Sequence, residues 1–262
     1  MKLDRREFLA GIAGVAASRG TLARDEWLAG VAAVDITPPA GIWMAGYAAR
    51  KEPSQGAAQP LHAKALALED ASGHRAVIVT MDLLGLTAEV VERIAEAVRS
   101  RHGLRRESLL LCSSHTHSGP VVNDQLSVAY DLSPAQWEAV RASTRRIEAQ
   151  VVEAVGRALG AGGPVRLRFG QGRAGFAANR RTAFPNGPTD HSVPVLGAER
   201  PDGTLAAVVF GYACHNTTLP ATFVRYHGDY AGVAQDDLER RHPGATALYI
   251  AGCGADANPA PR

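Results

Sequence analysis

The sequence has few cysteines, few aromatic residues and no apolar run long enough to cross a membrane. Its three cysteines, Cys112, Cys214 and Cys253, form an odd and widely spaced set, which excludes a closed disulfide framework and favours small buried side chains. Aromatic residues make up 6% of the 262 residues, so we expect a core built mostly from Val, Leu and Ala. The apolar stretch over residues 8–17 is about half of the ~20 residues that a bilayer span needs, so we predict no transmembrane span.

An excess of charge of one sign is also missing. The 28 Lys and Arg residues and the 26 Asp and Glu residues leave a formal net charge of +2, and the basic residues are scattered, so no nucleic-acid partner is predicted. With 46% hydrophobic and 21% charged residues, the composition is that of a soluble globular protein and excludes a disordered, coiled-coil or collagen-like chain. The motif Gly-x-Ser-x-Gly does not occur, which disfavours a serine hydrolase.

The first 23 residues differ from the rest of the chain. Arg5 and Arg6 precede a mildly apolar stretch of small residues, a pattern typical of a twin-arginine export signal. A short amphipathic helix is the alternative. We predict a signal over residues 1–23, cleavage somewhere beyond Ala17 with Ala23 as the candidate position, and a periplasmic or secreted destination for residues 24–262.

Strand-like and helix-like patterns follow one another through residues 24–262. Runs rich in Val, Ile and Leu predict strands over 31–36, 63–68, 76–81, 108–112, 165–169, 193–196, 205–213 and 245–251. Apolar periodicity predicts three helices, over 87–101, from 133 to the glycine-rich break at 160–164, and over 229–241. Thr87 is the expected N-cap of the first helix, and Ser133 with Gln136 forms the expected capping box of the second.

The fold class follows from the order of these elements. Pro201-Asp202-Gly203 separates two strand runs and predicts a β-hairpin over 193–213. Strands that alternate with helices early and pair by a hairpin later favour a mixed sheet. We predict an α/β fold, with α+β as the alternative, in which one layered domain holds a mixed β-sheet with flanking helices.

Two histidines follow the apolar run that ends at Cys112. In extended backbone the side chains of residues i and i+2 point to the same side, so His115 and His117 would face one cleft. Two such imidazoles can bind one metal ion, or one can bind while the other transfers protons. A surface loop that happens to carry two histidines is the alternative.

A third histidine, His215, stands at the end of the strand predicted over 205–213, where α/β proteins commonly assemble their sites. The resulting set of three histidines suits zinc, because neutral imidazole binds zinc well whereas calcium prefers oxygen ligands. Cys112 and Cys214 are alternative fourth ligands, although both precede the histidines on strands expected to be buried.

The remaining histidines and motifs indicate a functional role less strongly. Five further histidines lie in polar or turn contexts and are expected to be solvated: His62, His74, His102, His191 and His242. His227 precedes a helix that Asp229 is expected to cap, and it is left open as a ligand or a structural residue. Residues 170–175 fit Gly-x-Gly-x-x-Gly but no helical pattern follows, so nucleotide binding is not predicted. Arg180 can fix a carbonyl oxygen or an oxyanion, or form a surface ion pair.

Several motifs occur in an order that resembles the neutral/alkaline non-lysosomal ceramidase family. They are Ala33-Val34-Asp35-Ile36-Thr37-Pro38-Pro39, Met44-Ala45-Gly46-Tyr47, His115-Thr116-His117-Ser118-Gly119-Pro120, Asn179-Arg180, Ala213-Cys214-His215 and Gly254-Ala255-Asp256-Ala257-Asn258-Pro259. The resemblance covers about residues 28–262 and corresponds to the N-terminal part of that family's catalytic domain.

The resemblance implies an amidohydrolase that uses Zn2+ to cleave the amide of N-acylsphingosine (ceramide) into a fatty acid and sphingosine. It implies His115 and His215 as zinc ligands, His117 as the catalytic acid/base, and Arg180 as a catalytic residue that also orients the substrate. The implied partner is a lipid or N-acyl amide substrate, and a transient contact with a membrane surface is compatible with it.

The family completes its zinc shell with a glutamate and a tyrosine well downstream of Pro259, and it carries a C-terminal β-sandwich domain. Neither has a counterpart before Arg262. We therefore expect residues 24–262 to be a C-terminally truncated ceramidase-like catalytic domain. A metallohydrolase for another N-acyl amide or ester, and a catalytically inactive fragment, are the two alternatives.

Overall fold

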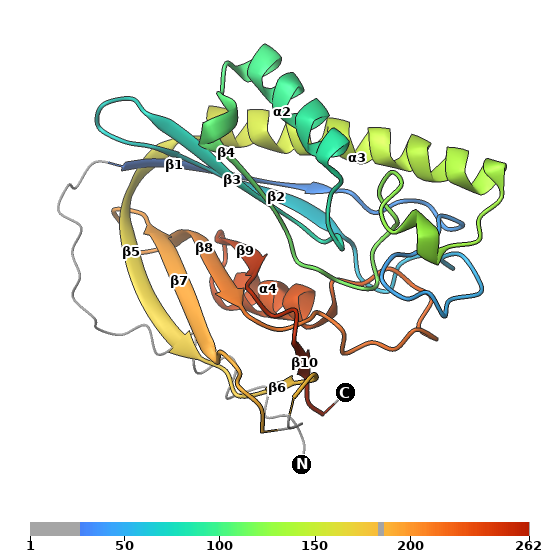
Figure 1. Cartoon of the computed structure of the whole chain (residues 1–262). Helices are drawn as coiled ribbons and strands as arrows, with labels where there is room; N and C mark the ends of the chain where they lie inside the picture. Colours follow the sequence, from blue (N-terminus) through green and yellow to red (C-terminus); the bar gives the residue numbers. More distant parts are fainter. Residues whose placement is uncertain (1–26, 183–185, 262) are drawn as a thin grey trace.

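The computed structural model describes residues 27–182 and 186–261 (Figure 1). Its strands are β1 (Trp27–Asp35), β2 (His62–Glu69), β3 (Arg75–Met81), β4 (Leu109–Ser113), β5 (Gly163–Arg173), β6 (Ala177–Asn179), β7 (Ser192–Glu199), β8 (Leu205–Tyr212), β9 (Thr246–Ala251) and β10 (Ala257–Pro259). Its helices are α2 (Ala88–His102), α3 (Pro134–Gly160) and α4 (Asp229–Arg241), with short 3-10 turns η1 (Arg106–Ser108) and η2 (Ser127–Ala129). The export signal predicted for residues 1–23 lies outside the described residues.

Eight strands form one mixed sheet in the order β4-β3-β2-β1-β5-β7-β8-β9. The two outermost pairs, β3 with β4 and β8 with β9, are parallel, and the pairs between them are antiparallel. Each parallel pair needs a crossover connection, which α2 supplies on one side and α4 on the other. β7 and β8 form the predicted hairpin, and β6 pairs with β10 in a separate two-stranded ribbon.

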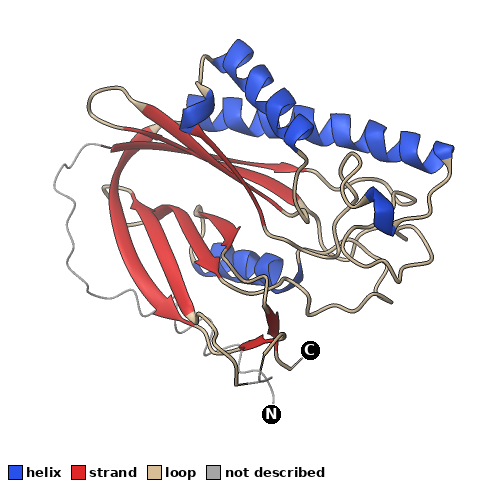
Figure 2. Ribbon diagram, viewed as in Figure 1, coloured by secondary structure: helices blue, strands red, loops and turns tan. Residues whose placement is uncertain are grey.

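The sheet folds over on itself, so that its two halves pack face to face. α2 and α3 lie together over the outer side of the β1–β4 half, and α4 lies against the half that ends in β9 (Figure 2). One apolar core lies beneath α2 and α3 and a second beneath α4. A third lies between the two halves and consists of Ala, Val and Leu side chains, among them Ala29, Leu66, Ala207, Val209 and Leu248. The fold is therefore a layered α/β arrangement, as predicted.

The burial of both sheet faces explains the strand patterns. In β8, Val208 and Phe210 belong to the core beneath α4, whereas Ala207 and Val209 belong to the core between the halves. A strand that is buried on both sides reads as a continuous apolar run rather than an alternating one. This is why the run over 205–213 stands out in the sequence.

Polar contacts also join the two halves. The ammonium group of Lys64 on β2 is buried and lies 2.7 Å from a carboxylate oxygen of Glu239 on α4. Asp82, at the end of β3, accepts hydrogen bonds from the backbone N–H of His62 and from the amide of Gln235 on α4. Burial raises the pKa of Asp82 above its ordinary value. These contacts link α4 to the opposite half of the sheet.

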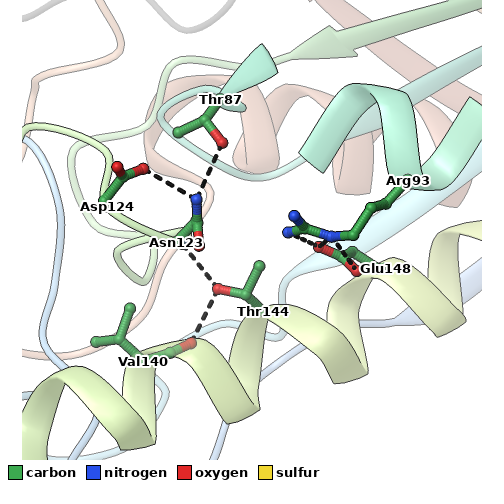
Figure 3. A network of polar contacts seen from close by, with 7 residues as sticks. All are labelled: Thr87, Arg93, Asn123, Asp124, Val140, Thr144 and Glu148. Carbon is green, nitrogen blue, oxygen red and sulfur yellow. Dashed lines mark hydrogen bonds and ion pairs between the residues drawn. The ribbon is translucent and has the colours of Figure 1, made fainter. Parts of the chain in front are cut away.

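For two of the helix N-caps predicted from the sequence, the structure shows the expected capping hydrogen bonds at α3 but not at α2. Ser133 and Gln136 form the predicted capping box at the start of α3. Thr87 occupies the N-cap position of α2, but its side chain makes no capping hydrogen bond. Its hydroxyl instead accepts a hydrogen bond from the side chain of Asn123 at 3.4 Å, so a tertiary contact replaces the expected local one (Figure 3).

Asn123 anchors the segment that leads from β4 to α3. It adopts a φ of 53°, in the left-handed region, and its backbone N–H donates to the hydroxyl of Thr144 at 2.8 Å. That hydroxyl donates in turn to the carbonyl of Val140, one turn earlier in α3. Beside this network, Arg93 of α2 forms a bidentate ion pair with Glu148 of α3 (Figure 3). The two helices and the segment are thus held as one unit.

The sequence missed the short strands β6 and β10, and its prediction for the cysteines was wrong in part. Cys214 is buried, as expected, but Cys112 is only half-buried and Cys253 is exposed.

Asp229 does not act as the N-cap of α4, because Gly228 holds that position. Among the described residues, no helix combines the length and the apolar character that a membrane span requires.

We predict that Thr144→Val lowers the free energy of unfolding by about 1–3 kcal/mol, because it leaves the backbone N–H of Asn123 without its acceptor in a half-buried place. Urea titration followed by circular dichroism measures the change. Arg93→Gln is the comparison, since its ion pair is half exposed and should contribute less than about 1 kcal/mol. A larger loss for Arg93→Gln than for Thr144→Val would contradict this account.

Candidate metal centre

The ends of β4 and β8 meet although the two strands belong to opposite halves of the sheet. The loop after β4 and the loop after β8 are joined by an isolated parallel bridge between Thr116 and Asn216. The backbone N–H of His117 donates to the carbonyl of Asn216 at 3.3 Å within this bridge. His115, His117 and His215 are therefore brought together by main-chain pairing rather than by their own side chains.

The three imidazoles form one compact group. The ring centroids of His115 and His215 lie 4.8 Å apart, those of His115 and His117 5.2 Å, and those of His117 and His215 5.6 Å. One nitrogen from each ring can be chosen so that all three atoms lie within 4.8 Å of one another. This is the one group of potential metal ligands found within residues 27–182 and 186–261. The structure thus places His115 and His117 in one group with His215.

Two of the rings are oriented by backbone carbonyl groups. Nδ1 of His115 lies 2.8 Å from the carbonyl oxygen of Leu84, and Nδ1 of His215 lies 2.9 Å from that of Gly254. A carbonyl oxygen only accepts hydrogen bonds, so each Nδ1 carries a proton, and in the neutral form of such a ring the lone pair is on Nε2. This is the arrangement commonly found behind metal-ligating histidines.

His115 has an unusual backbone as well. Its φ is 60°, which a residue with a side chain rarely adopts and which costs on the order of 1–3 kcal/mol. The hydrogen bond from its N–H to the carbonyl of Leu83 holds this conformation in place. In this conformation the His115 ring lies beside that of His215, with 4.8 Å between the two centroids.

His117 is the third ring, and neither of its nitrogens has a hydrogen-bond partner in the described structure although both are buried. Burial lowers the pKa of His117 to about 3, and the neighbouring His115, His215, Arg50 and Arg180 add to the effect. Burial likewise lowers the pKa of His215 below its ordinary value. At neutral pH both rings are therefore neutral and present lone pairs.

This donor set fits a transition metal ion such as zinc. Three imidazoles converge, two of them donate from Nδ1 to a carbonyl oxygen, and the third has buried nitrogens that nothing in the described chain satisfies. No cysteine joins the group: burial raises the pKa of the Cys214 thiol to about 12, which disfavours the thiolate that binds metals. The structure therefore gives no support to Cys112 or Cys214 as a ligand.

Arg180 lies at the rim of this group. The β6–β10 ribbon positions it, because its backbone N–H donates to the carbonyl of Asp256 at 2.7 Å. Its guanidinium donates twice to the carbonyl of Ala255, and Nη2 lies 3.3 Å from Nε2 of His215. Arg180 is exposed, so a cationic hydrogen-bond donor lies beside the histidines and faces solvent.

Asn216 and Asp229 hold the segments around the site in place, although within the described structure their side chains form no hydrogen bond with the three rings. Asn216 is fully buried and joins the loop after β8 to the start of α4 through the carbonyl of Gly228 and the N–H of Ala231. Asp229 has a φ of 56°, and its buried carboxylate accepts hydrogen bonds from the backbone of Thr218, Leu219 and Tyr230. Sequence reasoning missed both roles, since each depends on contacts between separate segments.

The remaining histidines do not belong to the metal-ligand group. His227 lies in the neighbouring segment, where its carbonyl accepts a hydrogen bond from Thr116 and its Nδ1 accepts one from Asp229, so its position is structural. The residues that resemble a dinucleotide motif continue β5 as far as Arg173, and the next element is β6 rather than a helix.

Tyr47, from the motif Met44-Ala45-Gly46-Tyr47, is a neighbour of the site for which no role was predicted. Its ring centroid lies 4.8 Å from that of His117. The preceding residue, Gly46, has a φ of 95° and lies directly against the His117 ring.

The comparison with known proteins gives a consistent result. The family model described as neutral/alkaline non-lysosomal ceramidase, N-terminal, matches residues 27–253. Neutral ceramidase A of Dictyostelium discoideum is 26% identical over 230 residues, which are 82% of this chain and 32% of the relative. The chain thus spans about a third of the length of this curated relative.

Two solved structures share the fold. Neutral ceramidase from Pseudomonas aeruginosa superposes with a TM-score of 0.79 at 22% identity, covering 90% of this chain and 40% of the other. A structure described as ceramidase complexed with C2 superposes with a TM-score of 0.77 at 22% identity, covering 90% of this chain and 39% of the other.

We predict that the purified chain binds zinc at this histidine group, with His115 and His215 as the ligands. His115→Gln should weaken the zinc affinity by at least about 100-fold, since loss of a residue that merely supports a ligand already costs 10–100-fold. Competition with a chromogenic chelator measures the affinity, and circular dichroism checks the fold. His74→Gln, which alters an exposed histidine in a turn, is the control. Equal affinities for His115→Gln and the unaltered chain would contradict the site.

Proposed function

Because the chain belongs to the neutral/alkaline non-lysosomal ceramidase family, we propose that it supplies the histidine-bearing part of a zinc-dependent amidohydrolase site. The proposed reaction is hydrolysis of the amide of N-acylsphingosine to a fatty acid and sphingosine. The observation that carries the proposal is the group of three imidazoles from two strand ends, with Arg180 at its rim.

His115 and His215 are the proposed zinc ligands. Their Nε2 atoms carry the lone pairs, since each Nδ1 donates to a carbonyl oxygen. A bound zinc ion would supply Lewis acidity and make water nucleophilic at neutral pH. The protein's part is to hold the two rings with a fixed tautomer, which favours binding without a further change of protonation.

His117 is the proposed proton carrier. Its nitrogens are committed to no other group of the described chain, and its ring lies beside those of His115 and His215. It can therefore accept a proton from the attacking water and return it to the departing sphingoid amine, a transfer that typically contributes 10²–10⁴-fold to a rate.

Arg180 is the proposed donor to the substrate. Its guanidinium is fixed by the carbonyl of Ala255 and borders His215, so its remaining N–H groups can bind the carbonyl oxygen of the scissile amide and the negative charge that develops there. A lipid or another N-acyl amide fits this chemistry, and so does an ester. A transient contact with a membrane surface is part of the proposal for a lipid substrate.

A second candidate function is a metal-binding chain without hydrolytic activity of its own. It is favoured by the composition of the ligand group, which contains three histidines and no carboxylate among the described residues. Sequence resemblance leads us to expect a glutamate and a tyrosine to complete the family's shell, and neither belongs to this group. Activity measured on the zinc-loaded chain separates the two candidates.

We predict that the zinc-loaded chain releases fatty acid from N-acylsphingosine in detergent micelles and that His117→Gln slows the release by at least about 100-fold while zinc content stays constant. Mass spectrometry of the released acid and metal analysis give the two quantities. His242→Gln, which alters an exposed histidine at the end of α4, is the control. Unchanged release by His117→Gln would remove His117 from the reaction, and no release by any form would favour the non-hydrolytic candidate.

Export is a separate part of the proposal: residues 1–23 direct residues 24–262 to the periplasm or out of the cell. The replacement of both Arg5 and Arg6 by lysine should retain the protein in the cytoplasm, because the twin arginines are the recognised feature. Fractionation and immunoblotting follow the distribution. Arg19→Lys is the matched control, and equal export of the two variants would contradict the signal.

A further inference from the structure

His117 differs from the other two histidines in how its ring is oriented. His115 and His215 are each fixed by a hydrogen bond to a carbonyl group, whereas both nitrogens of His117 lack such a partner within the described chain. A ring without hydrogen bonds can only be oriented by the shape of its surroundings. The residues packed against His117 therefore determine where its nitrogens point.

One side of the ring is closed by the backbone of Gly46. A Cβ atom on this residue would lie 2.5 Å from Cγ and Nδ1 of His117, closer than real contacts allow. Gly46 is itself held in place, because its N–H donates to the hydroxyl of Tyr130 at 3.0 Å. The ring thus rests directly on main chain.

Tyr47 closes another side. Its ring centroid is 4.8 Å from that of His117, with an angle of 61° between the two planes, which is an edge-to-face contact. His115 and His215 also meet His117 at steep angles, at centroid distances of 5.2 and 5.6 Å. Within residues 27–182 and 186–261, Tyr47 is thus the aromatic ring packed against His117 from outside the histidine group.

The Tyr47 ring is restrained at two points. Its hydroxyl donates to the carbonyl of Leu219 at 2.9 Å, in the loop that follows His215. The guanidinium carbon of Arg50 lies 5.0 Å from the Tyr47 ring centroid, within the range of a cation–π contact.

Arg50 is in turn almost fully buried, with 4% of its surface exposed. It donates to the carbonyls of Ala45 and Phe223 at 2.6 and 3.3 Å, which ties the segment around Tyr47 to the loop after β8. The position of Tyr47 is therefore set by both chain segments that border the site.

We propose that Tyr47 is a positioning residue that fixes the orientation of the His117 imidazole. The proposal rests on the proposed function in so far as His117 is taken as the proton carrier. Small errors in the placement of a proton carrier are costly, since a displacement of about 1 Å can lower a rate by ~10²-fold. The aromatic ring of Tyr47 carries this role, and its hydroxyl keeps that ring in place.

The test compares Tyr47→Leu, which removes the ring but keeps apolar bulk, with Tyr47→Phe, which keeps the ring. In zinc-loaded protein, Tyr47→Leu should lower kcat at least about 10-fold with little change in KM and no change in zinc content, and Tyr47→Phe should restore most of the loss. Tyr249→Phe, which removes a hydroxyl in the core beneath α4, is the control. An unchanged kcat, a change in KM alone, or zinc loss in proportion to activity would each overturn the proposal.

A second measurement does not depend on hydrolysis. In ¹⁵N NMR of the histidine side chains, His117, identified by comparison with His117→Gln, should give one sharp set of signals in the unaltered chain and in Tyr47→Phe. Tyr47→Leu should broaden or split the His117 signals and leave those of His115 and His215 in place, because their carbonyl bonds persist. Unchanged His117 signals, or equal changes in all three histidines, would overturn the proposal. A chain that hydrolyses nothing refutes the proposed function, while these spectra still decide the role of Tyr47.

Discussion

The site depends on main-chain pairing between two loops that lie far apart in the sequence. β4 and β8 belong to opposite halves of the sheet, and their ends meet only because the sheet folds over. The bridge between Thr116 and Asn216 then fixes one loop against the other, and the buried amide of Asn216 ties both to the start of α4. The bridge therefore sets the relative positions of the three imidazoles, because it holds the loop that carries His215 against the loop that carries His115 and His117.

Much of this architecture could be predicted from the sequence because local signals agreed with the fold. The capping box at Ser133, the apolar run that became β8 and the turn at 201–203 are each specified by a few neighbouring residues. The histidines could be selected because they directly follow two apolar runs. The family resemblance assigned roles to them, and the fold and the family match agree with that resemblance.

Features that depend on contacts between distant segments could not be predicted from the sequence. Thr87 looked like a helix cap, but its hydroxyl is used by Asn123 from another segment. β6 and β10 are too short to produce a pattern, and they form because they pair with each other. Tyr47 stood in a family motif without a role, since nothing in its neighbourhood along the chain indicates that it lies against His117.

The side chains between the two sheet halves give the interior an influence on the metal centre. Ala207 and Leu248 are fully buried there, and added bulk in a close-packed interior forces neighbouring groups to move. A larger side chain at Ala207 would wedge the halves apart and change the spacing between the ends of β4 and β8. The absorption spectrum of a bound metal ion depends on the positions of its ligands. Such a spectrum would therefore change when the packing of this distant core changes.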